Sequence, residues 1–289
     1  MKRYLALQKI VEYGSFSRAA EVMGYTQSAL SQMIASLEDE LHMRLLNRYR
    51  TGARLTAEGK ELYHSIQTLI NRYQSVMIKA GEILELDTGV VRMGVLGSIS
   101  VHWLPVLIRG FKEKYPHVEF VIHQGDHSSI EEWIRTGQVD FGFVNPRAVV
   151  GLQCEVLKQG QMMAILPKGH PLAEQKQVPL FSLAAEPFIL LEEGHYYEPL
   201  EAFKDVEVRP NIQYTIHDDY TIMTMVEAGL GVSILADLIL RRTNYEIEIR
   251  PTDPPVFRTI SIAYVSKDAL PAASRRFIRH IHENLTLLP

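Results

Sequence analysis

Residues 14–41 read GSFSRAAEVMGYTQSALSQMIASLEDEL, and their pattern predicts the structure of the N-terminal part of the chain. Apolar side chains recur in it at helical spacing in two runs, and a third helical run precedes it. Ser15 or Ser17 can cap the first of the two runs and Thr26 the second, while Gly24 supplies the tight turn between them. Short helices joined by such a turn predict a helix-turn-helix, whose second helix is sized for the major groove of DNA.

The polar face of that second helix carries short or amide side chains near its start. These are Gln27, Ser28, Ser31 and Gln32, and all of them can hydrogen-bond the edges of bases. A solvated helix face normally mixes Glu with Lys, whereas the acids of this helix come only at residues 38–40. The composition of this face therefore favours contact with DNA.

Basic residues are concentrated near the N-terminus. Residues 1–60 hold nine Lys and Arg against six Asp and Glu, whereas the whole chain holds 30 against 34 and has a net charge of −4. Since the chain is not a general polycation, any nucleic-acid site must be local. Residues 44–54 contain four arginines and no acid, which predicts an anion-binding strip, with a solvated loop as the alternative.

Apolar residues then repeat with alternating spacings of four and three, the heptad pattern of a coiled-coil seam. The seam residues are Leu62, Ile66, Leu69, Tyr73, Val76, Ala80 and Ile83. Gly59 and Gly81 bracket at least 21 residues, or roughly 30 Å of helix. We expect a dimerisation helix that also serves as a spacer, and the alternative is a long helix packed on its own domain. Residues 86–89 break the pattern and predict a linker.

From residue 90 onward, short apolar runs typical of buried parallel strands alternate with helical patterns. The expected strands are 90–96, 118–122, 139–144, 162–166, 188–191 and 232–235, and the expected helices include 129–137, 221–228 and 272–285. Open parallel sheets bind small molecules beyond the C-terminal ends of their strands. We therefore expect ligand contacts near residues 97–100, 125–128 and 145, and in the turn before Thr221.

Motifs along essentially the whole chain resemble the LysR-type transcriptional regulators. Segments 14–21, 25–31 and 37–41 are similar to that family's winged helix-turn-helix, and segments 44–48 and 55–59 to its wing and the start of its linker helix. LPKGHPL at 166–172 and EAGLGV at 227–232 resemble its effector-binding domain. Gln32 stands where many members carry Arg or Lys, and Ser28 where proline is frequent, so the base preference does not carry over.

The resemblance implies an α/β fold class with an N-terminal all-α winged helix-turn-helix head, a long linker helix, and a two-subdomain effector domain similar to periplasmic binding proteins. The expected boundaries are 1–58 for the head, 59–88 for the linker helix and hinge, and 89–289 for the effector domain. Within the effector domain, subdomain I would comprise about 89–160 and 267–289, and subdomain II about 161–266.

The resemblance further implies a DNA-binding transcriptional regulator controlled by a small-molecule inducer held between the two subdomains. It implies self-association as a dimer and a dimer of dimers, that is a homotetramer, with RNA polymerase as a further partner. The residues expected to bind DNA are Arg18, Thr26, Gln27, Ser28, Ser31, Gln32, Arg48, Arg50 and Arg54. The residues expected to bind the effector are Ser98, Ser100, His127, Ser128, Asn145, His195, Tyr196 and Asp218.

The charge of the effector is left open at this point. A hydroxyl and backbone N–H groups at a helix N-terminus favour an anion near Ser98, although an ordinary N-cap explains Ser98 equally well. The acids Asp126, Asp218, Glu192 and Glu193 lie near the expected site, so the helix N-terminus alone does not establish a strongly anionic inducer.

Composition and motifs exclude other classes of protein. With 289 residues, 46% of them hydrophobic, the chain predicts about two folded domains. Cys154 is the single cysteine, which excludes an internal disulfide and favours a cytoplasmic location. Charges interrupt the N-terminal segment and no run of about 18 apolar residues occurs, so we expect neither secretion nor a membrane span.

The sequence also lacks the motifs of common enzyme classes. No P-loop, G-x-S-x-G elbow, HExxH motif or paired-cysteine motif is found, so we expect no enzyme, no metal and no cofactor. A solute carrier whose helical head only dimerises is the alternative class, and the lack of a signal peptide counts against it. Redox sensing at Cys154 is disfavoured because the chain offers no resolving cysteine.

Overall fold

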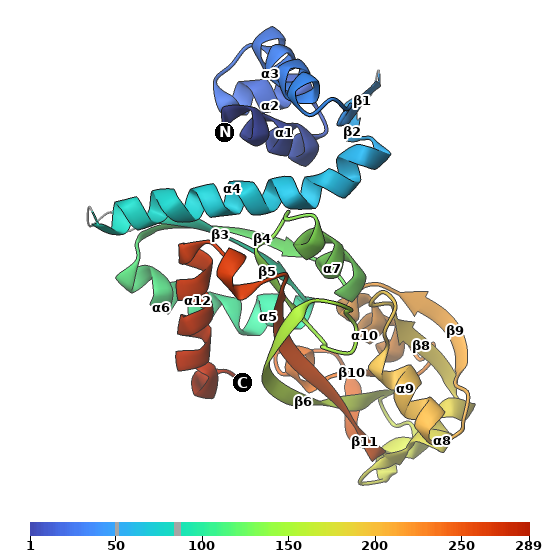
Figure 1. The fold of residues 1–289 in the computed structure, drawn as a ribbon. Helices are drawn as coiled ribbons and strands as arrows, with labels where there is room; N and C mark the ends of the chain where they lie inside the picture. Colours follow the sequence, from blue (N-terminus) through green and yellow to red (C-terminus); the bar gives the residue numbers. More distant parts are fainter. Residues whose placement is uncertain (50–51, 84–87) are drawn as a thin grey trace.

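The computed structural model describes residues 1–49, 52–83 and 88–289, except for the side chains of residues 74, 75 and 78–83 (Figure 1). A small N-terminal head lies on one side of a long helix and a larger α/β domain lies on the other side. None of the described helices is both long and apolar enough to cross a membrane.

The head is a helix-turn-helix followed by a hairpin. Its elements are α1 (Lys2–Tyr13), α2 (Phe16–Met23), α3 (Gln27–Glu40), β1 (Leu46–Tyr49) and β2 (Gly52–Leu55). Ser15 Oγ accepts a hydrogen bond from the backbone N–H of Arg18 at 3.4 Å, and Thr26 Oγ1 accepts one from Ala29 at 3.2 Å. Gly24 ends α2 with a φ of 70°. The predicted caps and the predicted turn are therefore confirmed.

The wing is the antiparallel β1–β2 hairpin, an element that the description of the head as all-α leaves out. Glu38 on α3 fixes where the wing begins, because its carboxylate accepts hydrogen bonds from the backbone N–H groups of Leu45 (2.7 Å) and Leu46 (3.1 Å). The head core beneath is made of side chains from all three helices, among them Leu7, Leu30 and Leu37. Local capping and one shared core thus hold the wing beside α3.

The long helix α4 (Ala57–Ile83) begins inside the head core. Tyr63, Ile66 and Ile70 are buried there, and Leu62 packs partly against them. Ile66 is only 4% exposed, so the expectation that it belongs to a seam with a partner chain is wrong. Its spacing fits the heptad, but the head already covers that part of the helix.

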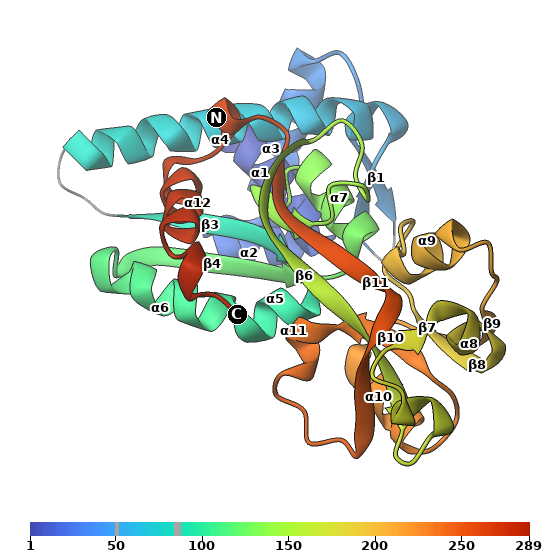
Figure 2. The same cartoon turned by 90° about the horizontal axis from the view of Figure 1, so that it is seen from below.

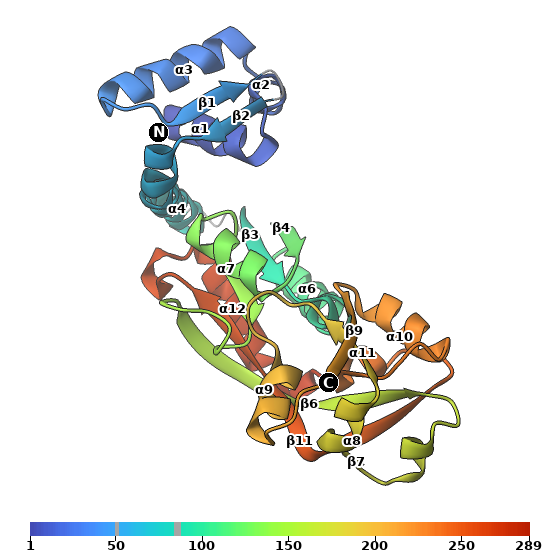
Figure 3. The same cartoon turned by 90° about the vertical axis from the view of Figure 1, so that its right-hand side faces the viewer.

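Farther along α4, the predicted seam is exposed. Leu69, Tyr73 and Val76 are 43%, 38% and 65% exposed, and Met77 beside them is 54% exposed. The side chains of Ala80 and Ile83 lie outside the described residues. We call Leu69, Tyr73, Val76 and Met77 the α4 stripe. The opposite side of α4 rests on the effector domain along β3 and α12, so the helix is packed on its own chain as well (Figure 3).

The effector domain is built on a mixed sheet of order β10-β6-β11-β5-β3-β4, with β7 beside β11. Its strands are β3 (Thr88–Val95), β4 (His117–Gln124), β5 (Phe141–Val144), β6 (Gln153–Pro167), β7 (Val178–Pro179), β10 (Ser233–Ala236) and β11 (Ile247–Tyr264), and β8 (Pro187–Leu191) pairs with β9 (Asn211–Ile216) separately. The helices are α5 (Gly97–His102), α6 (Leu104–Lys114), α7 (His127–Arg135), α8 (Leu180–Ala185), α9 (Glu198–Asp205), α10 (Asp219–Glu227), α11 (Asp237–Leu240) and α12 (Ala272–Glu283).

The expectation of parallel strands is correct for β3, β4 and β8, and β5 pairs parallel with β3 but antiparallel with β11. It is wrong for the run 162–166, which lies in β6 and pairs antiparallel. The run 232–235 is mixed, because Val232 forms a parallel bridge with Phe188 while β10 pairs antiparallel with β6. Sequence reasoning also missed β9 and the 18-residue strand β11. Pro251, Pro254 and Pro255 interrupt β11, and proline ordinarily argues against a long strand.

Strands β6 and β11 cross together from one half of the domain to the other and thereby join two subdomains (Figure 2). One half has its core around Trp103, Phe141 and Phe277, and the other half is built around β8 and β10. Residues 261–263 of β11 pair with β5, and Ile260 is buried in the first core. The chain therefore re-enters subdomain I before residue 260, and the expected boundary at 267 is corrected.

The α4 stripe generates a prediction about self-association. Replacing Leu69 and Val76 together with Glu should place two charges in an apolar contact, which costs several kcal/mol per unpaired charge when buried. We expect the molar mass from light scattering to fall toward that of a single chain, 32.9 kDa. Phe181→Glu, at an exposed apolar side chain on α8 of the other subdomain, serves as the matched control. An unchanged mass in the double variant would remove the stripe from the interface.

Candidate DNA-binding surface and effector site

The start of α3 presents polar side chains to solvent. Gln27, Ser28 and Gln32 are exposed and Ser31 is half-buried. Ser17 Oγ donates to Gln27 Oε1 at 3.3 Å, which orients that amide, whereas the Thr26 hydroxyl is already engaged as the cap of α3. The predicted base-reading residues thus share one exposed surface, and Thr26 contributes to it structurally.

The wing joins this surface through Arg48. Its guanidinium lies 4.4 Å from the centre of the Phe16 ring and donates to Ser31 Oγ at 3.4 Å. A cation over an aromatic face is held without being neutralised, so the charge stays available to a phosphate. Sequence reasoning missed Phe16 in this role because nothing in a local pattern shows that it faces the wing.

Other arginines surround the same surface. Arg54 is exposed and pairs with Asn47 across the hairpin, and Arg18 is exposed with its guanidinium 5.8 Å from the Tyr13 ring centre. Arg50 lies outside the described residues. Glu40, at the far end of α3, is paired with Arg3 at 2.5 Å. The exposed start of α3 is therefore flanked by cations, and two of the acids at its far end, Glu38 and Glu40, have partners of their own.

A second candidate site lies between the subdomains. Four loops enclose a cavity of about 240 Å³, and each loop follows the C-terminal end of a strand: β3, β4, β8 or β9. Of the eleven described residues that line it, five are acidic: Asp126, Glu192, Glu193, Asp218 and Asp219. None of the eleven is Lys or Arg, and His217 Nε2 lies 3.3 Å from Glu192 Oε2. We call this space the acidic cavity.

Behind the acidic cavity lies a buried ionic cluster centred on Arg258 of β11. The guanidinium donates to both oxygens of Glu198, at 3.0 and 3.2 Å, and to Glu193. Asn145 Nδ2 donates to Glu198 Oε1 at 3.0 Å, and the Asn145 backbone N–H donates to His127 Nδ1 at 3.4 Å. His127 and Asn145 belong to subdomain I and the two glutamates to subdomain II, so the cluster ties the subdomains together.

Sequence reasoning did not find Arg258 or Glu198. Arg258 lies in β11, a strand that its prolines made hard to predict. Its partners Glu198 and Glu193 are 60 and 65 residues away in the chain. One group of possible metal ligands occurs among the described residues, namely His127, Glu193 and Glu198, whose donor atoms lie within 4.8 Å of one another. Since Arg258 already occupies both carboxylates, a cation would first have to displace it.

The predicted effector residues are distributed around this region. Asp218 lines the acidic cavity and also caps α10, since its carboxylate accepts from the Thr221 backbone N–H at 2.7 Å. Ser128 Oγ accepts from the backbone N–H of His195 at 3.1 Å, which joins a loop of each subdomain. The His195 side chain is exposed.

The eight expected residues do not all line one cavity. Ser98 is buried and lines a different cavity of about 210 Å³ together with Arg258. Tyr196 lines a third cavity, of about 280 Å³, together with Asn145. Ser100 lines none of these three cavities. Residues of β6 and β11 line the cavities that hold Ser98 and Tyr196, whereas none of them lines the acidic cavity.

Cys154 is half-buried, and burial raises the pKa of its thiol. A raised pKa keeps the sulfur protonated and poorly nucleophilic at neutral pH.

Burial affects two members of the ionic cluster in opposite ways. It raises the pKa of Glu193 to about 7, although Arg258 acts against the rise, while Glu198 and Asp219 add to it. Burial also lowers the pKa of His127 to about 4, although the negative charge of Glu198 opposes this. Stability from Glu193 is therefore lost as pH rises from 4.5 to 7, and stability from His127 is lost as pH falls from 6.5 to 4.

These opposing contributions predict opposite pH responses for two variants. Relative to the wild type, Glu193→Gln should lose stability as pH falls from 7 to 4.5, because the variant lacks the term that favours low pH. His127→Gln should lose stability, relative to the wild type, as pH rises from 4 to 6.5. Urea denaturation across this range measures both differences, with the exposed Glu113→Gln as control. Slopes of the same sign in both variants would contradict the assignment.

The comparisons with known proteins place these two sites in one family. Residues 1–60 match the bacterial regulatory helix-turn-helix protein, lysR family, and residues 85–286 match the LysR substrate binding domain. The transcriptional dual regulator GltC of Bacillus subtilis (strain 168) is 31% identical over 241 residues, covering 81% of this chain and 80% of GltC. The uncharacterized regulator YvbU of the same organism is 29% identical, covering 95% of each chain.

Solved structures agree on the fold of the full chain. Full-length OxyR from Pseudomonas aeruginosa superposes with a TM-score of 0.77 at 24% identity, covering 99% of this chain and 97% of OxyR. Full-length CbnR in complex with its target DNA superposes with a TM-score of 0.64 at 20% identity, covering 98% of each chain. The chain belongs to the LysR family and is a transcriptional regulator with a helix-turn-helix DNA-binding head and a substrate-binding effector domain.

Proposed function

We propose that the start of α3 in this LysR-type regulator contacts the bases of the operator and that the wing contacts the DNA backbone. The observation that carries the proposal is the exposed, acid-free surface of Gln27, Ser28 and Gln32, with Arg48 and Arg54 beside it. Amide and hydroxyl groups hydrogen-bond base edges in the major groove, whereas arginines on a wing contact phosphates. Arg18 and Arg50 are assigned to the backbone on the same reasoning.

We propose that the effector is a small molecule carrying a positive charge, such as a protonated amine, bound in the acidic cavity. Five carboxylates and no Lys or Arg line that space, so an anion would meet repulsion there and a cation would find partners. Ser98, which would favour an inducer carboxylate, lines a different cavity. The charge of the walls therefore supports an amine over a carboxylate.

Effector binding would act by changing how the subdomains meet. Loops from both subdomains line the acidic cavity, and the Arg258 cluster joins the same two parts behind it. A cation bound against Glu193 and Asp219 would compete with Arg258 for negative charge. A ligand can shift a conformational equilibrium only through such a difference in affinity between two states.

The assembly and setting follow the same proposal. The α4 stripe would pair two chains, and two such dimers would form the tetramer that holds heads on separated half-sites. RNA polymerase as a partner, a cytoplasmic location and the absence of any cofactor or metal remain parts of the proposal.

The DNA contacts can be tested on the region upstream of the protein's own gene. Arg48→Ala should weaken binding to all sequences and reduce the slope of log affinity against log salt by about one. Gln32→Ala should leave that slope unchanged and cost about 1–3 kcal/mol at its base pair only. Fluorescence anisotropy with specific and scrambled duplexes at several salt concentrations measures both effects.

Arg109→Ala, an exposed arginine on α6, controls for loss of charge alone. If Arg48→Ala kept the wild-type salt slope, Arg48 would leave the set of phosphate contacts. If the wild-type oligomer showed no specific binding at any salt concentration, the operator-reading role of α3 would be overturned.

The effector class is tested by binding of simple probes to the full-length protein. Putrescine should raise the melting temperature, succinate at the same concentration should not, and Asp219→Asn should reduce the putrescine effect, since it removes a lining charge. Glu113→Gln controls for a change of surface charge. Stabilisation by succinate rather than putrescine would contradict a cationic effector.

A further inference from the structure

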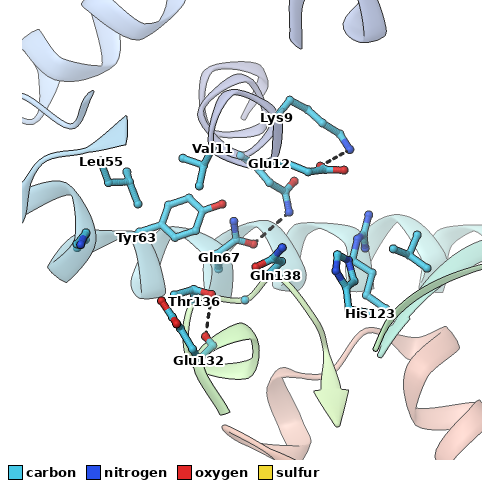
Figure 4. Close-up of a pocket in the computed structure, with 15 residues that line it drawn as sticks. Lys9, Val11, Glu12, Leu55, Tyr63, Gln67, His123, Glu132, Thr136 and Gln138 are labelled. Atoms are coloured by element: carbon cyan, nitrogen blue, oxygen red, sulfur yellow. Dashed lines mark hydrogen bonds and ion pairs between the residues drawn. The ribbon is translucent and has the colours of Figure 1, made fainter. Parts of the chain in front are cut away.

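A cavity of about 320 Å³ lies where the head, α4 and the effector domain meet (Figure 4). Its walls come from α1, from the first half of α4, and from β3, β4 and the end of α7. This volume is within the range of small-molecule sites and far exceeds the space that one water molecule needs. We call it the junction cavity; it shares no lining residue with the acidic cavity.

The charges of the junction cavity differ in sign from those of the acidic cavity. Lys60 of α4, Arg92 of β3 and His123 of β4 line it. The side chains of Lys60 and Arg92 form no hydrogen bond or ion pair within the described part of the chain, although the charge of Arg92 opposes the rise that burial gives the pKa of Asp140. Of the two acids that line the cavity, Glu12 is paired with Lys9 at 2.7 Å, so Glu132 is the lining carboxylate left to oppose the cations.

Gln67 supplies a further hydrogen-bond donor at this place. It is 1% exposed and its Oε1 accepts from Gln8 Nε2 at 3.1 Å. Its Nε2 has no hydrogen bond of standard geometry among the described residues, although it faces the Tyr63 hydroxyl as a donor. A buried donor that is only weakly satisfied would favour an acceptor that arrives beside it. In Figure 4 the Gln67 amide lies between Tyr63 and Gln138, at the edge of the cavity.

Gln67 also lies at a close approach between α4 and the effector domain. A Cβ atom at Gly137 would lie 2.3 Å from the Gln67 Cβ, so glycine is needed there for the effector domain to reach α4. His64 Nδ1 is also hydrogen-bonded to the carbonyl of Arg135 nearby. The head, α4 and the effector domain are thus in direct contact at this junction.

The junction cavity remains accessible when chains pair through the α4 stripe. Gln67 and Leu69 are two positions apart on α4, and residues at that spacing face different directions. A partner helix on Leu69, Tyr73 and Val76 would leave Lys60 and Gln67 facing the cavity.

We infer that the junction cavity is a second ligand site, which takes a small organic anion and fixes the head against the effector domain. The anion would lie between Lys60 and Arg92 and accept from Gln67, with Val11 and Leu55 against its apolar part. An occupant would bridge α1 and β3 and so couple binding in the effector domain to the position of the head. The protein would then respond to two ligands of opposite charge at two separate places.

Citrate is the probe for this site, titrated into the full-length protein against sodium chloride of equal ionic strength. The Trp133 ring lies 5.4 Å from that of His123, so Trp fluorescence should change with saturation and the change should vanish in Trp133→Phe. Arg92→Gln and the exposed Lys60→Gln should each weaken citrate binding about fivefold or more, the scale of one charge contact. Arg109→Gln on α6 is the matched control and should bind as the wild type does.

Each outcome bears on the inference. Absence of saturable citrate binding, or equal affinity in both variants and the wild type, would overturn the site. If citrate bound but left the affinity for the upstream DNA unchanged in the wild type, the coupling to the head would be overturned. Putrescine binding unaltered in Arg92→Gln would keep this test separate from that of the acidic cavity, and loss of both responses would overturn their independence.

Discussion

The two halves of the effector domain depend on one buried guanidinium. Arg258 is held between Glu193 and Glu198, and Asn145 and His127 extend the same network into the other subdomain. Burying a charge is costly unless partners compensate it, and removing one partner leaves the others uncompensated. The network therefore favours one particular arrangement of the subdomains. The network also places more carboxylates than cations at the back of the acidic cavity, and this excess gives the cavity its negative charge.

Charge is separated along this molecule according to what each surface contacts. Arginines surround the exposed start of α3, carboxylates line the space between the subdomains, and Lys60 and Arg92 face the junction. A net charge of −4 for the whole chain conceals these local fields. Such separation lets one regulator attract polyanionic DNA at one end without drawing it to the effector domain.

Helix α4 connects these regions because different lengths of it serve different contacts. Its first half completes the head core with Tyr63 and Ile66, its exposed stripe is free for a second chain, and its remaining side rests on β3 and α12. A rigid helix that contacts the head, the effector domain and a second chain can convert a change in the effector domain into a change in head position. Gln67 contacts Gly137 of the effector domain, so a movement of that domain would act directly on α4 at this residue.

The helix-turn-helix, its caps at Ser15 and Thr26, and the exposed residues of α3 could be predicted from the sequence, because capping and helical periodicity act over only a few residues. The sequence could not determine that Ile66 would be buried by the head, since a heptad does not say which neighbour covers it. Only the folded domain shows the pairing of β11 with β6, the distribution of the predicted effector residues over several cavities, and the Arg258 cluster. The β11–β6 pairs and the bonds of Arg258 to Glu193 and Glu198 join residues 60 or more positions apart, and only the packing of the whole domain brings such partners into contact.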